Sequence, residues 1–438
     1  MSKVEESVEE KVFRAIDKRK EDTIKFFREL VMIPSVSGLE GDAQRLVAKK
    51  FKDLGMEVEM VEADEKQLRK HPAFFETLSF KKYGYEDRPN ALGRLKGVGG
   101  GRSLLVMAHI DTVPAEPIEA WKHPPYGGVI EDGRLYGRGA TDPKQGITAM
   151  VAALQGILDA GLKQKGDLLY TTMNEEEDGG AGGAFTIIVQ RGVKADGAIY
   201  YGSPPEPAQL PETIGVGVAG AGLRYVEIRV HGEMAHTASG AGVNAIGKAM
   251  KIYKAIAKLN EERQKRITYK LIKDRPATNF VISTISAGNW PSNVPALCVM
   301  QARIAWPPSE KTENAIKEFE DAIKKVVQGD EWLREHPPEL EYVSWMAEPH
   351  EQDPNHPIVK MVMRNTEHVT GKKTILRGGA AGTDSRHPVL YGGIPTVAGW
   401  KGVGGGSHSV DEWADIDTTI LASKLLALNI LEWCGHVS

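Results

Sequence analysis

The chain has 438 residues, of which 41% are hydrophobic and 26% are charged, values that are ordinary for a globular protein. Its 55 Lys and Arg residues nearly balance 59 Asp and Glu, and the formal net charge of −4 does not indicate a nucleic-acid-binding or membrane-binding surface. The two cysteines, Cys298 and Cys434, exclude a disulfide framework. We therefore expect two domains and a small-molecule partner, with neither nucleic acid nor a membrane as a partner.

The N-terminus carries no recognisable targeting signal. Residues 1–11 are charged and lead into an amphipathic helix, without the apolar core of a signal peptide. No run approaches the ~18 apolar residues that a membrane span needs. We expect a cytoplasmic protein.

Helix and strand patterns alternate over the first half of the chain. Helices are predicted at residues 4–32, about 40–54, 146–160 and after Gly183. Strands are predicted at 55–61, 90–95, 103–109, 166–173 and 197–201. This alternation predicts an α/β domain with a mostly parallel sheet and helices on both faces. The polar, aromatic-rich stretch 66–88 is unperiodic, and we predict an insertion over the surface or over an entrance.

The pattern changes near Thr213. Strand-like stretches at 216–230, 280–285 and 297–304 combine with helices at about 244–264 and 311–327. Helices with mostly antiparallel strands indicate an inserted α+β domain at 214–346. Residues 1–213 and 347–438 would then form the two parts of the α/β domain.

The apolar strand at 104–109 ends in a histidine, and an aspartate follows two residues later. His109 and Asp111 are two residues apart, so their side chains share one face of an extended chain. Ligands bind at such strand ends in α/β sheets. A carboxylate beside an imidazole is typical of metal sites, where it fixes the ring or binds beside it.

Further candidate ligands stand at the ends of predicted elements. Asp142 precedes the buried helix, and its two oxygens can bridge two cations. Glu175, Glu176 and Glu177 follow a strand, and three adjacent carboxylates repel one another unless a cation or solvent separates them. His408 lies in a glycine-rich loop.

The chain order His-x-Asp, Asp, Glu-Glu and late His resembles the metallohydrolase family that includes acetylornithine deacetylase, succinyl-diaminopimelate desuccinylase, aminoacylase and bacterial glutamate carboxypeptidase. The resemblance extends from about Lys20 to the C-terminus. It implies that His109 binds one metal, that Asp111 orients this histidine, and that Asp142 bridges two metals.

The resemblance also assigns roles within the glutamate run. Asn174-Glu175-Glu176 matches the family's Asp-Glu-Glu, which implies Glu175 as the general base and Glu176 as a ligand of the second metal, together with His408. The additional Glu177 leaves this register open by one residue.

One turn departs from the family. The family usually has an acidic Gly-Glu-Pro turn after the strand at 198–201, where this chain has Ser203, with Glu206 as an alternative ligand. A neutral serine is a poor ligand for a hard divalent cation. We therefore expect one tight metal site and a second that is weak or absent. His and carboxylate ligands suit zinc, manganese or cobalt.

The inserted domain resembles the family's lid and dimerisation domain, which implies a homodimer or a higher homo-oligomer. In the family, the histidine that matches His236 reaches a neighbouring subunit's active site and stabilises the substrate oxyanion. Asn293 and Arg303 match positions that hold the substrate or the lid.

The late segment supplies two further candidates. Arg386 matches a family loop and is the leading candidate for binding a substrate carboxylate. In the alternative interpretation, Asp384 and Arg386 only pin the loop. Glu412, four residues after His408, is predicted to support that ligand.

These residues imply a metal-dependent hydrolase that cleaves an amide or peptide C–N bond in a small carboxylate-bearing substrate, with a glutamate base and a metal-activated water. Two alternatives stay open. One is an aminohydrolase that releases ammonia from a non-peptide substrate, aromatic substrates included, for which the aromatic residues of 66–88 would line a pocket. The other is a catalytically silent metal-binding or ligand-binding protein.

Overall fold

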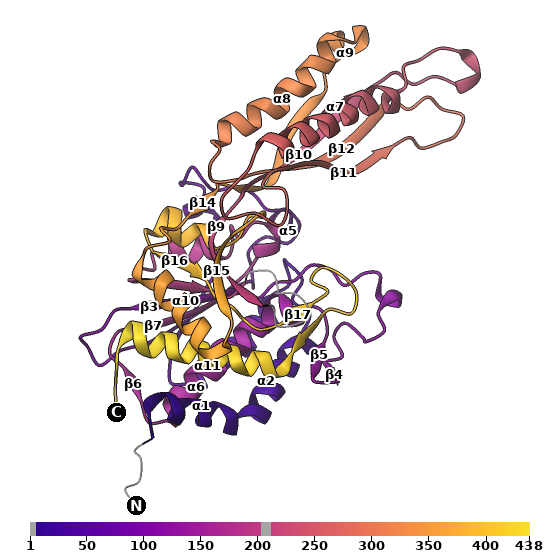
Figure 1. Ribbon diagram of the computed structural model, residues 1–438. Helices are drawn as coiled ribbons and strands as arrows, with labels where there is room; N and C mark the ends of the chain where they lie inside the picture. The colour runs from indigo at the N-terminus through magenta and orange to yellow at the C-terminus, as the bar shows by residue number, and fades with distance from the viewer. Residues whose placement is uncertain (1–5, 203–211) are drawn as a thin grey trace, which may run out of the picture. The chain divides into compact units, whose positions relative to one another are not determined.

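The structure is a computed structural model that describes residues 6–202 and 212–438 (Figure 1). It divides into two compact units. The first comprises the described residues up to Val218, together with Gln352–Arg377 and Thr383–Ser438, and the second comprises Ala219–Glu351 and Gly378–Gly382. The inserted domain predicted at 214–346 thus overlaps most of the second unit.

The sheet of the first unit has a parallel centre. Strands β7, β3, β8 and β16 are parallel neighbours in this order, while β2 and then β1 continue the sheet antiparallel beyond β7. The bounds are β1 (Glu57–Val61), β2 (Asn90–Leu95), β3 (Leu104–His109), β7 (Leu168–Met173), β8 (Ala198–Tyr200) and β16 (Thr396–Ala398). Every residue of β3 is buried, as its continuous apolar run predicts.

Further strands join this sheet or lie beside it. β9 (Thr213–Gly220) pairs with β16, with β15 (Lys373–Gly379) and with β14 (His350–Glu351). A small sheet contains β4 (Val129–Glu131), β5 (Arg134–Tyr136), β17 (Gly404–Gly405) and β18 (Trp413–Asp415). β6 (Lys163–Gln164) pairs with β19 (His436–Val437).

Helices pack around the sheet of the first unit. They are α1 (Val8–Lys18), α2 (Lys20–Met32), α3 (Gly41–Asp53), α4 (Glu65–Leu68), α5 (Leu78–Tyr83), α6 (Gln145–Asp159), α10 (Pro357–Thr370) and α11 (Ile416–Cys434). α6 is buried along most of its length between α1, α2, α11 and β3, because its sequence is apolar on nearly every side. On burial, each large apolar side chain contributes about 1.5–3 kcal/mol. The predicted α/β architecture is confirmed.

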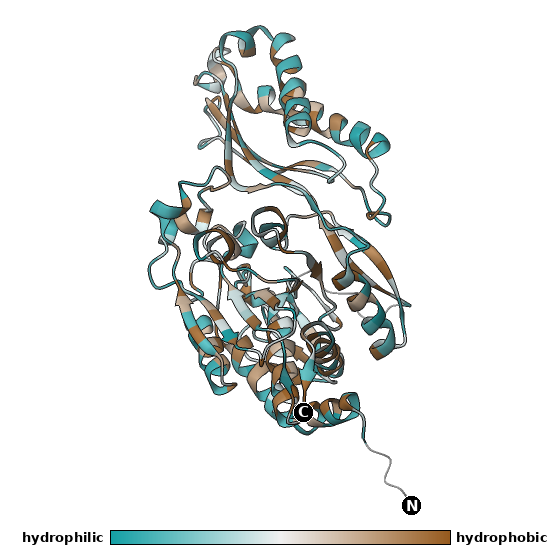
Figure 2. Ribbon diagram, turned by 90° about the vertical axis from the view of Figure 1, so that its left-hand side faces the viewer, coloured by the Kyte–Doolittle hydropathy of each residue, from teal (hydrophilic) through white to brown (hydrophobic). Residues whose placement is uncertain are grey.

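The second unit is an α+β layer. Its antiparallel sheet has the order β11 (Asn279–Ala287), β12 (Leu297–Trp306), β10 (Gly222–His231) and β13 (Glu339–Ala347). Helices α7 (Ala245–Arg266) and α8 (Thr312–Gln328) pack on it, and α9 (Glu331–Glu335) follows. Figure 2 shows hydrophilic residues on the outer turns of the helices of this unit.

The stretch 66–88 packs in part against the first unit. Phe75 and Tyr85 are buried, and Tyr85 packs with Leu68 and Phe185 in one hydrophobic cluster. Its aromatic residues therefore serve packing, at least in part. Within the described residues, no helix is both long enough and apolar enough to cross a membrane.

Candidate metal centre

His109 ends strand β3 with its ring held at both nitrogens. Its Nδ1 lies 3.1 Å from the backbone oxygen and 3.3 Å from Oδ1 of Asp111, and its Nε2 lies 3.4 Å from Oδ1 of Asp142. Asp111 therefore stands where the sequence places an orienting carboxylate. The ring is 1% exposed, so water does not screen these charges.

Several carboxylates surround the buried ring of His109. Burial opposes protonation of the ring, yet the carboxylates of Glu176, Asp111 and Asp142 raise the pKa of His109 well above its usual value. Burial likewise raises the pKa of Glu176 well above its usual range. Clustered buried carboxylates of this kind require a cation, and this donor set of histidine nitrogen and carboxylate oxygen fits a divalent metal ion.

Glu412 holds the backbone of the loop that carries Asp142. Its Oε1 accepts hydrogen bonds from the amides of Thr141 (3.1 Å) and Asp142 (2.9 Å). Its Oε2 accepts from the amide of Gly139 (2.9 Å) and from Nη1 of Arg138 (2.8 Å). Burial raises the pKa of Glu412 to about 7. These four bonds go to the Asp142 loop, and the expected support of His408 by Glu412 stays a prediction.

The second oxygen of Asp142 faces a different set of partners. Ser407 donates a 2.6 Å hydrogen bond to Oδ2, and Nε2 of His408 lies 3.7 Å from the same oxygen. The same His408 nitrogen lies 3.0 Å from Oε2 of Glu177. Ligand atoms of His109, Asp142 and Glu177 all lie within 4.8 Å of one another. Because His109 faces Oδ1 of Asp142 and His408 faces Oδ2, Asp142 stands between two histidines.

Glu175 does not point into this cluster. Its Oε1 pairs with Nη2 of Arg88 at 2.7 Å and accepts from Oγ of Ser79 at 3.0 Å, and its Oε2 accepts from the amide of Gly182 at 2.8 Å. The Arg88 guanidinium also binds Glu40. Burial raises the pKa of Glu175 to about 7, while Arg88 opposes this shift. Both oxygens of Glu175 are therefore engaged in a buried structural network.

These contacts favour the other register of the glutamate run, which the sequence leaves open by one residue. Glu175 has a positive φ of 61°, which turns the backbone before the next two residues. The amides of Glu176 and Glu177 then donate to Asp111 at 2.9 and 3.1 Å. Glu177, rather than Glu176, lies beside His408.

Glu176 lies between the two halves of the centre. Its Oε2 is 4.0 Å from Nε2 of His109, and its Oε1 accepts a 3.2 Å hydrogen bond from the hydroxyl of Tyr200. Tyr200 is fully buried at the end of β8, where it is the partner of Met107 in β3. Nothing in the sequence pattern distinguished Tyr200 from an ordinary strand tyrosine.

Lys401 is a second residue that sequence reasoning missed. Its side chain is 3% exposed, and its Nζ lies 3.8 Å from Oδ1 of Asp142. Burial lowers the pKa of Lys401, and the carboxylates of Asp142 and Glu412 counteract this shift. A glycine-rich neighbourhood was the only signal at this position.

The guanidinium of Arg386 is buried against backbone carbonyls. Its Nη1 donates to the carbonyl of Thr383 at 2.9 Å, and its Nη2 donates to the carbonyl of Gly179. Arg386 thus ties its own loop to the turn that follows the glutamate run. These contacts favour the interpretation in which Arg386 pins the loop, and its assignment to a substrate carboxylate stays a prediction.

The candidates of the second unit form a group of their own. His236 and Asn293 are partners in an isolated antiparallel β-bridge, and Thr237 donates to the carbonyl of Ser292 at 2.9 Å. His236 is exposed. Arg303 of β12 donates to the carbonyl of Ala380 at 3.3 Å.

Two predicted positions cannot be placed. Ser203 and Glu206 lie outside the described residues. The expectation that Ser203 weakens one metal site therefore stays a prediction.

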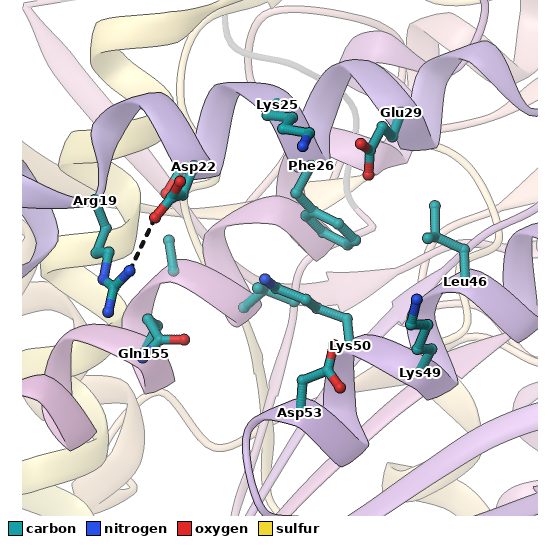
Figure 3. A pocket seen from close by; sticks show the side chains of 13 residues that line it. Arg19, Asp22, Lys25, Phe26, Glu29, Leu46, Lys49, Lys50, Asp53 and Gln155 are labelled. Atoms are coloured by element: carbon teal, nitrogen blue, oxygen red, sulfur yellow. Dashed lines mark hydrogen bonds and ion pairs between the residues drawn. The ribbon is translucent and has the colours of Figure 1, made fainter.

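A separate hollow of about 380 Å³ lies between α2, α3 and α6 (Figure 3). The charged residues that line it are of both signs: Arg19, Asp22, Lys25, Glu29, Lys49, Lys50 and Asp53. Arg19 and Asp22 pair across 3.0 Å. The balanced lining selects neither an anion nor a cation, and it includes none of the predicted site residues.

Comparison with known sequences finds one family and several enzymes. A model of Peptidase family M20/M25/M40 matches residues 105–432. The chain is 27% identical, over 447 aligned positions and 98% of each chain, to N-formyl-4-amino-5-aminomethyl-2-methylpyrimidine deformylase of Halalkalibacterium halodurans. It is 29% identical to the Bacillus subtilis enzyme of the same name, over 80% of this chain and 84% of the other. It is 27% identical to succinyl-diaminopimelate desuccinylase of Methylobacterium nodulans, over 89% and 91%.

Solved structures share the fold. The dipeptidase Dug1p of Saccharomyces cerevisiae superposes with a TM-score of 0.78 at 16% identity, covering 97% of this chain and 98% of that one. YXEP of Bacillus subtilis, described as a dinuclear metal-binding peptidase, superposes with a TM-score of 0.59 at 15% identity, covering 95% and 99%.

Proposed function

This chain belongs to the M20/M25/M40 peptidase family, and from that premise we propose that it is an N-deacylase that hydrolyses the amide of a small N-acylated molecule. It is a metal-dependent hydrolase that acts on carbon–nitrogen bonds. The observation that carries the proposal is the cluster of His109, Asp142, Glu177 and His408, with a carboxylate oxygen of Glu176 4.0 Å from Nε2 of His109.

Three side chains supply ligand atoms on the Oδ2 side of Asp142. They are Asp142 itself, Glu177 and His408, and His109 approaches the other oxygen of the same aspartate. When bound there, a divalent ion supplies Lewis acidity and lowers the pKa of a water molecule towards ~7. Zinc, manganese and cobalt all suit these donors, and we keep the prediction of one tight and one weak site.

Glu176 replaces Glu175 as the proposed general base. Tyr200 holds Oε1 of Glu176, which leaves Oε2 on the His109 side of the centre to take a proton from water and to deliver it to the leaving nitrogen. Asp111 supports this geometry in two ways. It fixes the His109 ring, and it accepts hydrogen bonds from the backbone amides of Glu176 and Glu177.

The substrate is proposed to be an N-acyl compound in which the carboxylate is dispensable. The predicted carboxylate-binding guanidinium of Arg386 is engaged with two backbone carbonyls. Relatives that align over most of the chain are named as a deformylase of an aminomethylpyrimidine and as a desuccinylase, and both names denote removal of an acyl group from nitrogen. A formamide on a neutral heterocycle is therefore the first substrate to test.

A substrate panel tests the proposal. Purified protein loaded with Zn²⁺, Mn²⁺ or Co²⁺ is incubated with N-formyl-4-amino-5-aminomethyl-2-methylpyrimidine, with N-succinyl-diaminopimelate and with a set of dipeptides. We expect formate or succinate release that stops when the metal is chelated. Cleavage of dipeptides alone would contradict the proposed deacylase activity and would indicate a peptidase instead. Ammonia release would favour the aminohydrolase alternative, and metal uptake without any turnover would favour the silent binding protein.

The second unit carries the proposed contribution to a partner subunit. His236 and Asn293 are adjacent on this unit, and the family resemblance places that histidine in a neighbouring active site. We expect a homodimer by light scattering. Mixing His236→Ala with Glu176→Gln chains should restore part of the activity, because a mixed dimer then contains one intact site.

A further inference from the structure

We propose that Asp411 is a positioning residue of the metal centre. It ties the turn at residues 406–412 to the backbone of His123, and it thereby fixes where the turn presents His408. The inference rests on the proposed metal-dependent function and adds a residue that acts through a ligand rather than by binding the ion itself.

The ring of His408 is held mainly by the metal centre. Its side chain is 53% exposed, and its Nε2 lies 3.0 Å from Oε2 of Glu177 and 3.7 Å from Oδ2 of Asp142. Both of these partners are themselves proposed metal ligands. Because the ring is not buried by packing, the backbone of the turn has to set its position.

The backbone of this turn is strained. Gly406, His408 and Asp411 have positive φ values of 71°, 60° and 52°. A residue other than glycine in this left-handed conformation costs free energy, and it persists where the surrounding structure enforces it. Two such residues in one short turn indicate that contacts with other segments hold its shape.

The carboxylate of Asp411 supplies such a contact. Its Oδ1 accepts a 2.9 Å hydrogen bond from the backbone amide of His123, and Nδ1 of the His123 ring lies 3.5 Å from the same oxygen. His123 is buried, and its ring stacks on Tyr136 with 4.0 Å between the ring centroids. The segment after His123 is held as well, because the amide of Arg138 donates to the carbonyl of Pro125 at 2.8 Å. Asp411 therefore anchors the turn to a well-packed part of the first unit.

Other side chains of the turn contact the metal centre directly. Ser407 donates to Oδ2 of Asp142 at 2.6 Å, and Glu412 holds the loop that carries Asp142. The Asp411 contact instead leads to His123, in a segment that carries none of the proposed ligands. Loss of the Asp411 contact should therefore loosen His408 without removing any ligand.

Metal binding by Asp411→Gly tests the inference without any substrate. Glycine adopts the positive φ freely, so this change removes the hydrogen bond and adds no strain to the turn. Full-length protein is freed of metal by a chelator, titrated with Co²⁺ and followed by visible absorption. Asp411→Gly should bind Co²⁺ about 10- to 100-fold more weakly than the wild type. The thermal unfolding midpoint of the metal-free variant should stay close to that of the metal-free wild type.

Three further variants separate position from strain and from folding. Asp411→Asn keeps an acceptor oxygen and should retain most of the wild-type affinity. Asp132→Gly makes the matched change at an exposed residue with a φ of 51° between β4 and β5, and it should bind Co²⁺ like the wild type. In a His408→Ala chain, the additional change Asp411→Gly should cost little further affinity, because Asp411 acts through His408.

Each outcome decides the question. Wild-type Co²⁺ affinity in Asp411→Gly would overturn the positioning role and leave the proposed function in place. The same holds for a loss of affinity that is equally large with and without His408, or equally large in Asp132→Gly. An Asp411→Gly chain that does not fold would show that Asp411 serves folding instead, and would overturn the inference as well. A wild-type chain that binds no Co²⁺ would contradict both the inference and the proposed function.

Discussion

The carboxylate of Glu175 is paired with the guanidinium of Arg88 at 2.7 Å, and both side chains are almost completely removed from water. This pair takes the first of three consecutive glutamates out of the metal centre. Consequently Glu176 and Glu177 are the glutamates of this run that we propose for catalysis and for metal binding. The same pair joins the stretch 66–88 to the turn that carries the glutamates.

The favoured register predicts different outcomes for neighbouring glutamates. Glu176→Gln should lower kcat by about 10²- to 10⁴-fold, because it removes the general base, and should leave the thermal unfolding midpoint close to that of the wild type. Activity assays and calorimetry on the same preparation check both parts. A Glu176→Gln enzyme with wild-type kcat would show that another residue acts as the general base.

Glu175→Ala should act on stability instead. Glu175→Ala removes one of the two carboxylates that pair with Arg88 and leaves the amide of Gly182 without its acceptor, which should cost about 1–3 kcal/mol. Denaturant unfolding measures this loss. Simultaneous replacement of Arg88 by Met should increase the loss, because the buried carboxylate of Glu40 then loses its partner as well, whereas a fully stable but inactive Glu175→Ala chain would support the original register.

The hydroxyl of Tyr200 should matter for turnover and not for folding. Hydrogen bonds to charged groups contribute about 1.5–3 kcal/mol, so Tyr200→Phe should lower kcat by about 10- to 100-fold with little change in KM. Tyr201→Phe is the matched control, because that neighbouring tyrosine is equally buried and its hydroxyl has no hydrogen-bond partner among the described residues. Equal effects of the two changes would refute a specific role for Tyr200.

Glu412 should determine how well the Asp142 loop binds metal. Glu412→Ala leaves the amides of Thr141 and Asp142 without their acceptor, and we expect a ~10- to 100-fold loss of metal affinity. Competition with a chelating dye measures the affinity. Glu131→Gln serves as the control, since Glu131 binds His123 and Lys122 away from Asp142. The prediction fails if both variants bind metal equally well.

Asp330 should make the stability of the second unit depend on acid pH. Burial alone would raise the pKa of Asp330, but hydrogen bonds from Lys248 and Lys251 lower it below its usual value. Because the folded pKa is depressed, this stabilisation is fully present above the unfolded value of about 3.9 and is lost as the pH falls below it.

Unfolding of wild type and Asp330→Asn at a series of pH values checks this prediction. The destabilisation caused by the substitution should be large at neutral pH and should shrink as the pH falls below about 4. A destabilisation that is constant over this range would show that Asp330 does not act through its charge.

Much of the architecture follows from local patterns. Alternating helix and strand signals predicted the α/β sheet, and the continuous apolar run at 104–109 predicted the fully buried strand β3. The order of His109, Asp142 and His408 along the chain likewise indicated a metal centre. These features can be predicted from the sequence because hydrophobic periodicity and strand ends depend on residues that are neighbours in the chain.

The assignment of individual carboxylates was decided by the tertiary structure. Three adjacent glutamates look alike in sequence, and only the approach of Arg88 from a distant segment makes Glu175 structural. In the same way, contacts between remote loops direct Glu412 to the Asp142 loop and Lys401 to one oxygen of Asp142. The sequence by itself determined which residue types form the centre, and the tertiary structure decided their roles, because a buried charge acts according to the partner that folding places beside it.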